Sequence, residues 1–246
     1  MLLHQRRILR PTPPPPPPTF EDPLSLPVWL VDNVTHEATE IPCEPATRQV
    51  NYLATDSEVA DTLSILSRVS GAPVALVNLI AYMADICTNH AVDTHDLVVG
   101  NAPLDREYLR FVVPPSSTPH LEVLSSSLVI ECVSHDQGWA SDDADNHSYK
   151  NCWSWVEFEV VDVSNGSVVL PRQEMCRNLR ASKPFRRHRL RVTDKAILDR
   201  LRPGCHVVLH LRAEFNAWSN HARYASISLR QWWGLRDEES AVISSC

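Results

Sequence analysis

The stretch Leu128-Val-Ile-Glu-Cys-Val-Ser-His-Asp-Gln-Gly-Trp139 is echoed later in the chain by Val207-Val-Leu-His-Leu-Arg-Ala-Glu-Phe-Asn-Ala-Trp218. In both stretches, apolar residues alternate as in a β-strand, and the strand runs into a polar turn that ends in Trp. The segments that precede them, residues 101–113 and 178–192, also resemble each other. Such an internal echo predicts related strand pairs within one all-β unit, which we place at about residues 95–233.

The rest of that unit also follows a strand pattern. From Asp96 onward the hydrophobic period is two, and short apolar runs are separated by turn residues such as Asn165-Gly166 and Pro203-Gly204. Many short strands of this kind are typical of a sandwich or a barrel. We therefore predict a mainly β fold, a jelly-roll-like antiparallel β-sandwich.

A helical pattern precedes the strands. Thr55-Asp-Ser-Glu58 is a capping box, in which the Thr side chain caps backbone N–H groups and the Glu side chain reaches back. Apolar residues follow at helical spacing, Gly71 can end the helix in a left-handed conformation, and Pro73 suits the start of a second helix. The sequence thus predicts a short helical hairpin, assigned to residues 51–94. The apolar stripe of its second helix needs a partner surface.

The two ends of the chain lack such patterns. Residues 1–50 are rich in proline, with an unbroken run from Pro13 to Pro18, and we predict a disordered arm there. A proline run of this kind can act as a spacer or as a ligand for aromatic-lined grooves. At the other end of the chain, residues 234–246 are predicted to form a flexible tail.

Composition narrows the class of protein. The chain has 246 residues and a formal net charge of −7, which argues against a general nucleic-acid binder. Seven cysteines are widely spaced without a CxxC pair, as in a reduced intracellular protein. The N-terminus does not resemble a signal peptide, and the uncharged span 69–84 is too short to cross a bilayer. We therefore expect a cytoplasmic or nuclear protein that binds neither nucleic acid nor membrane.

Three short motifs occur in a specific order in the first half of the predicted sandwich: Asp136-Gln-Gly-Trp139, His147-Ser-Tyr149 and Cys152-Trp-Ser-Trp155. Together with Arg177-Asn178 and Pro203-Gly204, they resemble a group of uncharacterised fungal proteins that carry a DQGW…SWTWFE signature. The resemblance covers about residues 95–230 and implies a shared β-sandwich domain. The chain departs from the group at Ser154-Trp155-Val156, where Thr-Trp-Phe is usual.

Two further likenesses bear on function. In that fungal group a short helical element often precedes the β unit. Residues 72–82 are similar to this element and to the start of an F-box, a helical motif that docks to a ubiquitin-ligase adaptor. The β unit also resembles, in its architecture, the sugar-binding jelly rolls of F-box-associated glycoprotein receptors. These likenesses imply binding of a carbohydrate or glycoprotein, and docking through the helical element.

The Trp-ended turns are the strongest candidates for a binding site. A Trp ring beside Asp, Gln and Asn can stack on a sugar ring while the polar groups bind its hydroxyls. Alternatively, the Trp residues close the ends of the sandwich. We predict a non-catalytic recognition or adaptor protein that binds carbohydrate or glycoprotein. The candidate ligand-binding residues are Asp136, Gln137, Trp139, Trp155, Asn216, Trp218 and Asn220.

Two other functions stay open. One is docking of a protein partner through the helical hairpin, for which the candidate contacts are Val74, Val77 and Ile80. The other is an enzyme whose site is assembled from dispersed residues, such as His135, Asp136 and His221. Because no GxSxG, HExxH, P-loop or GxGxxG motif occurs, we predict no catalytic residue, no metal and no cofactor.

Overall fold

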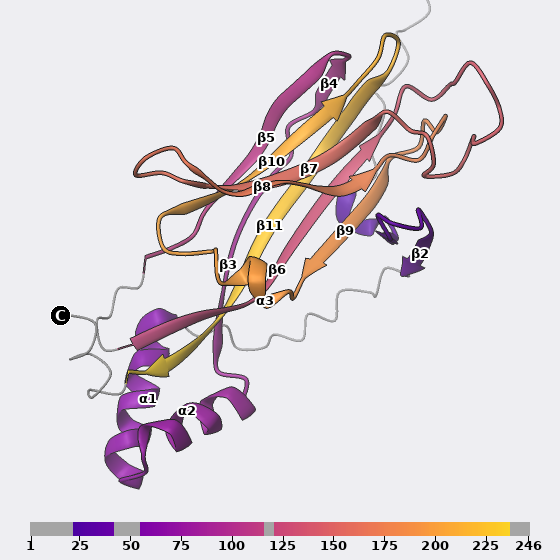
Figure 1. Cartoon of the computed structure of the whole chain (residues 1–246). Helices are drawn as coiled ribbons and strands as arrows, with labels where there is room; N and C mark the ends of the chain where they lie inside the picture. Colours follow the sequence, from indigo (N-terminus) through magenta and orange to yellow (C-terminus); the bar gives the residue numbers. More distant parts are fainter. Residues whose placement is uncertain (1–21, 42–54, 116–120, 237–246) are drawn as a thin grey trace, which may run out of the picture.

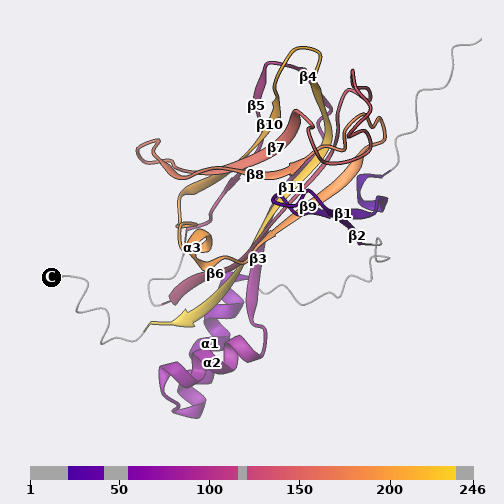
Figure 2. The ribbon, with the colours of Figure 1, turned by 45° about the vertical axis from the view of Figure 1, so that its right-hand side comes forward.

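The computed structural model describes residues 22–41, 55–115 and 121–236. They form two β-sheets packed face to face, with a pair of helices at one end (Figures 1 and 2), which confirms the predicted mainly β sandwich. The larger sheet runs in the order β2 (Ala38–Ile41), β1 (Val28–Val31), β9 (Arg186–Val192), β6 (Leu121–His135), β11 (Ser219–Leu235) and β3 (Cys87–Thr94), and β4 (Val98–Asn101) also pairs with β11. The smaller sheet runs in the order β5 (Leu104–Val112), β10 (Cys205–Ala213), β7 (Ser154–Asp162) and β8 (Val168–Arg177).

The chain crosses repeatedly between the two sheets, as in a jelly roll. β5 lies in the smaller sheet, β6 in the larger, β7 and β8 in the smaller, and β9, β10 and β11 then alternate. Among the described residues the paired strands are antiparallel, except that β1 runs parallel to β9. The two echoed stretches therefore lie in opposite sheets, because residues 128–135 belong to β6 and residues 207–213 to β10.

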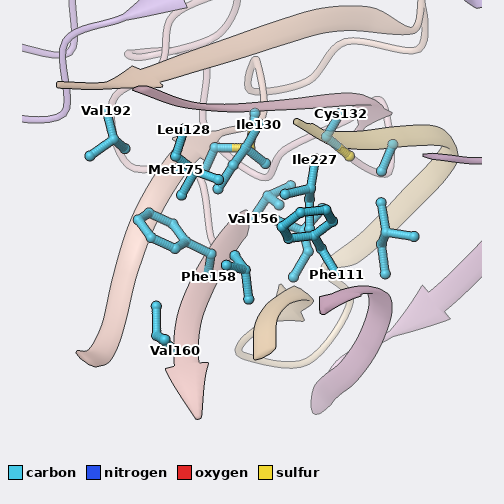
Figure 3. Close-up of a cluster of buried hydrophobic side chains, with 14 of the residues drawn as sticks. Phe111, Leu128, Ile130, Cys132, Val156, Phe158, Val160, Met175, Val192 and Ile227 are labelled. Carbon is cyan, nitrogen blue, oxygen red and sulfur yellow. The ribbon is translucent and has the colours of Figure 1, made fainter. Parts of the chain in front are cut away.

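The main core lies between the sheets, because each strand turns alternate side chains inward. Phe158 from the smaller sheet and Ile130 from the larger sheet are both fully buried there (Figure 3). Burial of such side chains is the dominant favourable term in folding. Other members of this core are Phe111, Leu128, Cys132, Val156, Val160, Met175, Val192 and Ile227.

A second core joins the helical hairpin to the far ends of β6 and β11. The hairpin consists of α1 (Asp56–Ser70) and α2 (Val74–Met83), as predicted. The two strands extend beyond the sandwich, and their ends lie against both helices (Figures 1 and 2). The buried side chains of this second core are Val59, Leu63, Val77, Ala81, Leu121 and Trp233.

Local signals set the ends of α1 as predicted. Thr55 and Glu58 form the capping box: the Glu58 N–H donates to Thr55 Oγ1 at 3.3 Å, and the Thr55 N–H donates to Glu58 Oε2 at 2.8 Å. Gly71 follows α1 with a left-handed φ of 59°. Asn78 on α2 then ties the hairpin to the sheet. Its side chain donates to the Leu235 carbonyl at 3.0 Å and accepts from the Leu235 N–H at 2.8 Å.

The hairpin ends earlier than the predicted boundary at residue 94. Residues Cys87–Thr94 form β3 instead, which pairs with β11 from Cys87↔Trp232 to Thr94↔Ala225. The β-branched residues Thr88 and Val92 favour a strand, and the edge of β11 needs a neighbour to satisfy its backbone groups. The larger sheet therefore begins before residue 95.

Part of the predicted disordered arm is also ordered. Within residues 1–50, the 3-10 helix η1 (Pro23–Ser25) is followed by the β1–β2 hairpin. Val28 is buried, and Val31 packs against the main core, so apolar burial accounts for the docking of this segment on β9. The run Pro13–Pro18 lies outside the described residues.

The predicted boundary of the C-terminal tail also shifts. Gly234 and Leu235 belong to β11 and pair with Glu122 and Leu121 of β6. Gly234 passes so close to Asn78 that a Cβ atom would lie 3.0 Å from its Nδ2 atom. The strand continues to this point because the Asn78 side chain binds both backbone groups of Leu235.

Strand β9 turns alternate side chains to opposite faces of the larger sheet. Arg187 and Arg189 both donate to Glu131 on β6, with Arg187 Nη2 at 2.7 Å from Glu131 Oε2. His188 between them points into the protein and is 1% exposed. Its Nε2 atom lies 3.2 Å from the Tyr149 hydroxyl. Burial lowers the pKa of His188 to about 3, so the folded protein holds a neutral imidazole at neutral pH.

Acidification should destabilise the fold through His188. Between pH 6.5 and about 3 the unfolded His binds a proton that the buried His188 does not, so stability falls as the pH falls through this window. From about pH 7 to about pH 4.5, the wild type should lose about 2 to 3 kcal/mol more unfolding free energy than His188→Gln. Urea denaturation at both pH values measures the difference. The exposed control His95→Gln should follow the wild type, and equal losses in wild type and His188→Gln would contradict the prediction.

Candidate functional site

Three loops gather at the end of the sandwich away from the helical hairpin, and we call them the loop end (Figures 1 and 2). They are residues 136–153 between β6 and β7, residues 178–185 between β8 and β9, and residues 214–218 between β10 and β11. The echoed stretches lead into the first and third loops, so the two Trp-ended turns meet here. The Ser219 N–H donates to Gln137 Oε1 at 3.3 Å across them.

Asp136 holds the first two loops together from the inside. Its side chain is fully buried and accepts hydrogen bonds from the backbone N–H groups of Gly138 (2.7 Å), Ala181 (2.6 Å) and Ser182 (3.0 Å). Burial raises the pKa of Asp136, and these hydrogen bonds oppose that shift. Because both carboxylate oxygens are used in this way, Asp136 shapes the loop end and does not face a ligand.

Asn220 has a similar internal role. It is fully buried, and its Nδ2 atom donates to the backbone oxygens of Trp155 at 2.8 Å and Arg212 at 3.0 Å. Its Oδ1 atom accepts from Asn178 Nδ2 at 3.1 Å, and Asn178 Nδ2 also donates to Ser154 Oγ at 2.9 Å. The polar atoms of the Asn220 side chain are therefore bonded within the protein. This network links strands of both sheets beneath the loops.

Arg180 organises the longest loop. Its side chain is almost fully buried, and it donates from Nη1 to the backbone oxygen of Asn151 at 3.0 Å and from Nη2 to Asp142 Oδ2 at 2.7 Å. The guanidinium also lies 5.7 Å from the ring centre of the half-buried Trp218. Trp218 thus packs within the loop end, which matches the alternative role predicted for these Trp residues.

The backbone of the loop end adopts unfavourable conformations at several positions. The non-glycine residues with positive φ there are His147, Asn151, Ala181, Phe215 and Ala217. Each such conformation costs about 1 kcal/mol or more and persists only where the surrounding structure imposes it. Gly138, with a φ of 80°, also lies under the Lys183 side chain, which occupies the place of a Cβ atom. Because strain of this kind concentrates at binding sites, it is an argument for function here.

Two aromatic side chains remain exposed at the loop end. Trp139 is 52% exposed and Phe215 is 55% exposed. Asn216, next to Phe215, is exposed as well. Gln137 positions Trp139 by donating from Nε2 to the Trp139 carbonyl at 2.6 Å. Trp139, Phe215 and Asn216 are therefore among the groups that a ligand can reach. The sequence reasoning missed Phe215, although an aromatic residue inside a polar turn was a usable signal.

Trp155, the second residue of β7, lies next to the loop end on the outer face of the smaller sheet. Its Nε1 atom donates to Glu157 Oε2 at 3.0 Å. The guanidinium groups of Arg177 and Arg212 lie 5.7 Å and 5.4 Å from its ring centre. Arg212 in turn donates to Glu157 Oε1 at 2.9 Å and to Asp105 Oδ2 at 3.2 Å. Trp155 therefore belongs to a charged network on this face.

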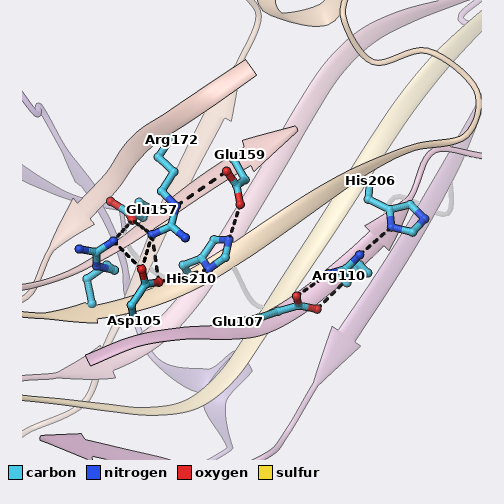
Figure 4. Close-up of polar contacts among 9 residues, drawn as sticks. Asp105, Glu107, Arg110, Glu157, Glu159, Arg172, His206 and His210 are labelled. Carbon is cyan, nitrogen blue, oxygen red and sulfur yellow. Dashed lines mark hydrogen bonds and ion pairs between the residues drawn. The ribbon is translucent and has the colours of Figure 1, made fainter. Parts of the chain in front are cut away.

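That network extends across the strands of the smaller sheet (Figure 4). Arg172 on β8 donates to Asp105 Oδ1 at 2.9 Å and to Glu157 Oε1 at 2.8 Å. On the neighbouring strands, His210 Nε2 lies 2.9 Å from Glu159 Oε1. Opposite charges on adjacent strands form favourable cross-strand pairs. Since these acidic and basic groups satisfy one another, we assign this face a structural role.

The dispersed set of His135, Asp136 and His221 is only partly brought together. The two imidazole rings stack, with their centres 4.5 Å apart. The Asp136 carboxylate instead binds the backbone N–H groups described above. Burial lowers the pKa of His135 to about 4 and also lowers the pKa of His221. In residues 22–41, 55–115 and 121–236, no three His, Cys, Asp or Glu side chains are grouped to hold a metal ion.

The predicted docking residues of the hairpin differ in burial. Val77 is buried in the second core, Val74 is half-buried, and Ile80 is 40% exposed. Val77 therefore cannot contact a partner in this fold, because the ends of β6 and β11 cover it. In the part of the chain that the structure describes, no helix has the length and apolar character needed to span a membrane.

Comparisons with known proteins assign no family. No protein-family model and no curated protein matches the chain. Among solved structures, the chain is similar to that of the infectious bursal disease virus Gx strain, with 8% identity, a TM-score of 0.34, and coverage of 61% of this chain and 37% of that one. The chain is also similar to dimeric latent PorU from Porphyromonas gingivalis, with 7% identity, a TM-score of 0.28, and coverage of 57% of this chain and 13% of that one. The chain thus spans well under half the length of these proteins, and the likeness indicates no function.

Removal of the Asp136 carboxylate should destabilise the protein. In Asp136→Ala, one buried and two partly buried N–H groups lose their acceptor, and each unsatisfied donor costs about 1 to 3 kcal/mol. We expect the unfolding free energy, measured by urea denaturation, to fall by about 3 kcal/mol or more. The control Asp143→Ala removes an exposed carboxylate from the same loop and should change stability by less than about 0.5 kcal/mol. Equal stability of the two variants would show that Asp136 does not hold the loops.

Proposed function

We propose that this protein is a non-catalytic recognition module that binds a carbohydrate, free or on a glycoprotein, at the loop end of its sandwich. The observation that carries the proposal is the exposure of Trp139 on a loop that the buried Asp136 holds in place through hydrogen bonds to Gly138, Ala181 and Ser182. An exposed aromatic ring on a rigid support is suited to stacking, because little conformational entropy is lost on binding.

The exposed groups of the loop end fit a sugar. One face of a pyranose ring is apolar and can cover an indole ring, while its hydroxyls need donors and acceptors at the rim. Asn216 supplies an exposed amide that can do both, and Phe215 supplies a second aromatic surface on the third loop. The exposed carboxylates of Asp142 and Asp143 on the first loop are acceptors for sugar hydroxyls.

The structure suits binding without a large rearrangement. Asp136 joins the first and second loops, Gln137 joins the first and third, and Arg180 fixes the course of the first. The left-handed residues and the buried charges cost free energy during folding and not on binding. A ligand therefore meets loops that are already ordered. The resemblance to sugar-binding jelly rolls, which rests partly on the same Trp loops, supports the proposal.

An adaptor function through the F-box-like hairpin has less support. It was predicted to use Val74, Val77 and Ile80, and burial of Val77 removes the central contact of that set. Of that set, Ile80 alone belongs to the exposed apolar surface of α2, and Val74 is half-buried. We therefore place ligand recognition at the loop end.

The test is a screen of the full chain against a glycan array, followed by titration with the free glycan that binds best. Trp139→Ala should weaken binding by about tenfold or more, because it removes the stacking surface. Trp139 is half-exposed, so the variant should keep its urea denaturation midpoint. Asn216→Ala should weaken binding of the same glycan by a smaller factor, because one hydrogen-bonding group is lost.

Val163→Ala is the matched control, because Val163 is 53% exposed and lies in the β7–β8 turn, outside the three loops. It should bind the glycan as the wild type does. A folded wild-type chain that binds no glycan, or a Trp139→Ala variant with undiminished affinity, would refute the proposal.

A further inference from the structure

Helix α2 presents an apolar face to the outside of the molecule. On its inner side, Val77 and Ala81 are buried in the second core. On its outer side, four large apolar residues follow the spacing i, i+3, i+4 and i+7, which places them on one face of a helix. These residues, which we call the α2 outer face, are Leu76 (46% exposed), Leu79 (51%), Ile80 (40%) and Met83 (78%).

The α2 outer face is continuous and uncharged. The sequence from Val69 to Ala84 contains no Asp, Glu, Lys or Arg, and Tyr82 beside the face is 62% exposed. Isolated exposed apolar side chains are common on protein surfaces, but a contiguous apolar patch marks an interaction surface. The partner of this face must itself be apolar, because a charged group buried against it would be left without a counterion.

We propose that the α2 outer face docks against the same face of a second copy of the chain, in a two-fold symmetric dimer. In such a dimer the two α2 helices run antiparallel, and each apolar face is covered by an identical one. The uncharged segment is bounded by Arg68 before it and Asp85 after it. An antiparallel arrangement brings the Arg68 end of one copy toward the Asp85 end of the other. Charges of opposite sign then face each other at both ends of the contact.

Net charge also favours this surface for self-association. Each chain carries a formal charge of −7, so two copies repel each other over most of their surface. The face of α2 carries no charged residue, so it adds nothing to that repulsion, and it offers apolar surface for burial. Arg68 is exposed, and the Asp85 side chain keeps 51% of its surface exposed although it pairs with Arg230. Both flanking charges can therefore reach a second copy.

The shape of the molecule permits the contact. The hairpin projects beyond the sandwich at the end opposite the loop end (Figures 1 and 2). Two copies can meet through α2 with their sandwiches pointing away from each other. The dimer does not depend on the proposed function, but if the loop ends bind glycans, it would present two binding sites and raise the avidity for a multivalent surface.

The contact is small, so the dimer should be weak. The ten residues of α2 span about 15 Å, and an interface of this length lies at the lower end of specific interfaces. We expect a dissociation constant on the order of micromolar to tens of micromolar. Sedimentation velocity of the full chain between about 1 and 200 micromolar should then show a shift from monomer to dimer.

One substitution on the face and one matched control locate the contact. Leu79→Glu places a charge at the centre of the face and should weaken the dimer by at least about tenfold. The control Val163→Glu introduces the same charge on the sandwich, at a site of similar exposure. Val163 is 53% exposed and Leu79 is 51% exposed, and the control should leave the dimer intact. Because both sites are half-exposed, circular dichroism should show folded protein in each case.

Cross-linking tests the symmetry. A residue near a two-fold axis meets its own copy, so Leu79→Cys should form a disulfide-linked dimer under mild oxidation, whereas Val163→Cys should not exceed the background from the native cysteines. A wild-type chain that stays monomeric over the whole concentration range would overturn the proposal and leave the face to another protein or to another segment of this chain. A dimer that Leu79→Glu does not weaken would place the contact elsewhere and overturn it as well.

Discussion

The pairing of β6 with β11 is the interaction on which the rest of the molecule depends. The two strands pair from His135↔His221 at one end to Leu121↔Leu235 at the other. Their middle parts contribute to the core between the sheets, one end of the pair leads into the loop end, and the other end forms the second core with the helices through Leu121 and Trp233. A slip of one residue would exchange buried and exposed side chains in both cores, so this register fixes where both ends of the molecule lie.

Buried polar groups, rather than apolar packing, give the loop end its shape. Asp136, Arg180 and Asn220 are almost or fully inaccessible to solvent, and each binds backbone groups of segments far apart in the sequence. In a low-dielectric interior such bonds are strong, and leaving any one partner unpaired is costly. The bond from Asp136 holds the left-handed residue Ala181 in place, and Trp139 stays on the outside.

The sequence located the candidate site better than it identified the exposed residues in it. The echo placed Trp139 and Trp218 at corresponding positions after two related strands, and the structure brings both turns to the loop end. Their environments differ, because Trp218 packs on a buried guanidinium whereas Trp139 projects outward. The sequence reasoning did not predict the environment of Trp155. This residue lies on β7, on the outer face of the smaller sheet, where it packs against Arg212. Exposure depends on contacts between distant segments, which spacing does not reveal.

The sequence by itself determined the parts of this protein that depend on near neighbours: the alternating strands, the capping box at Thr55 and the left-handed end of α1 at Gly71. These signals act within a few residues, so a single chain shows them. Only the tertiary structure decided that Cys87–Thr94 is a strand and that residues 28–41 join the sheet, because both need the unpaired edge of another strand. It also decided which face of α2 is buried, because the helix has apolar residues all round and the sheet covers one side of it.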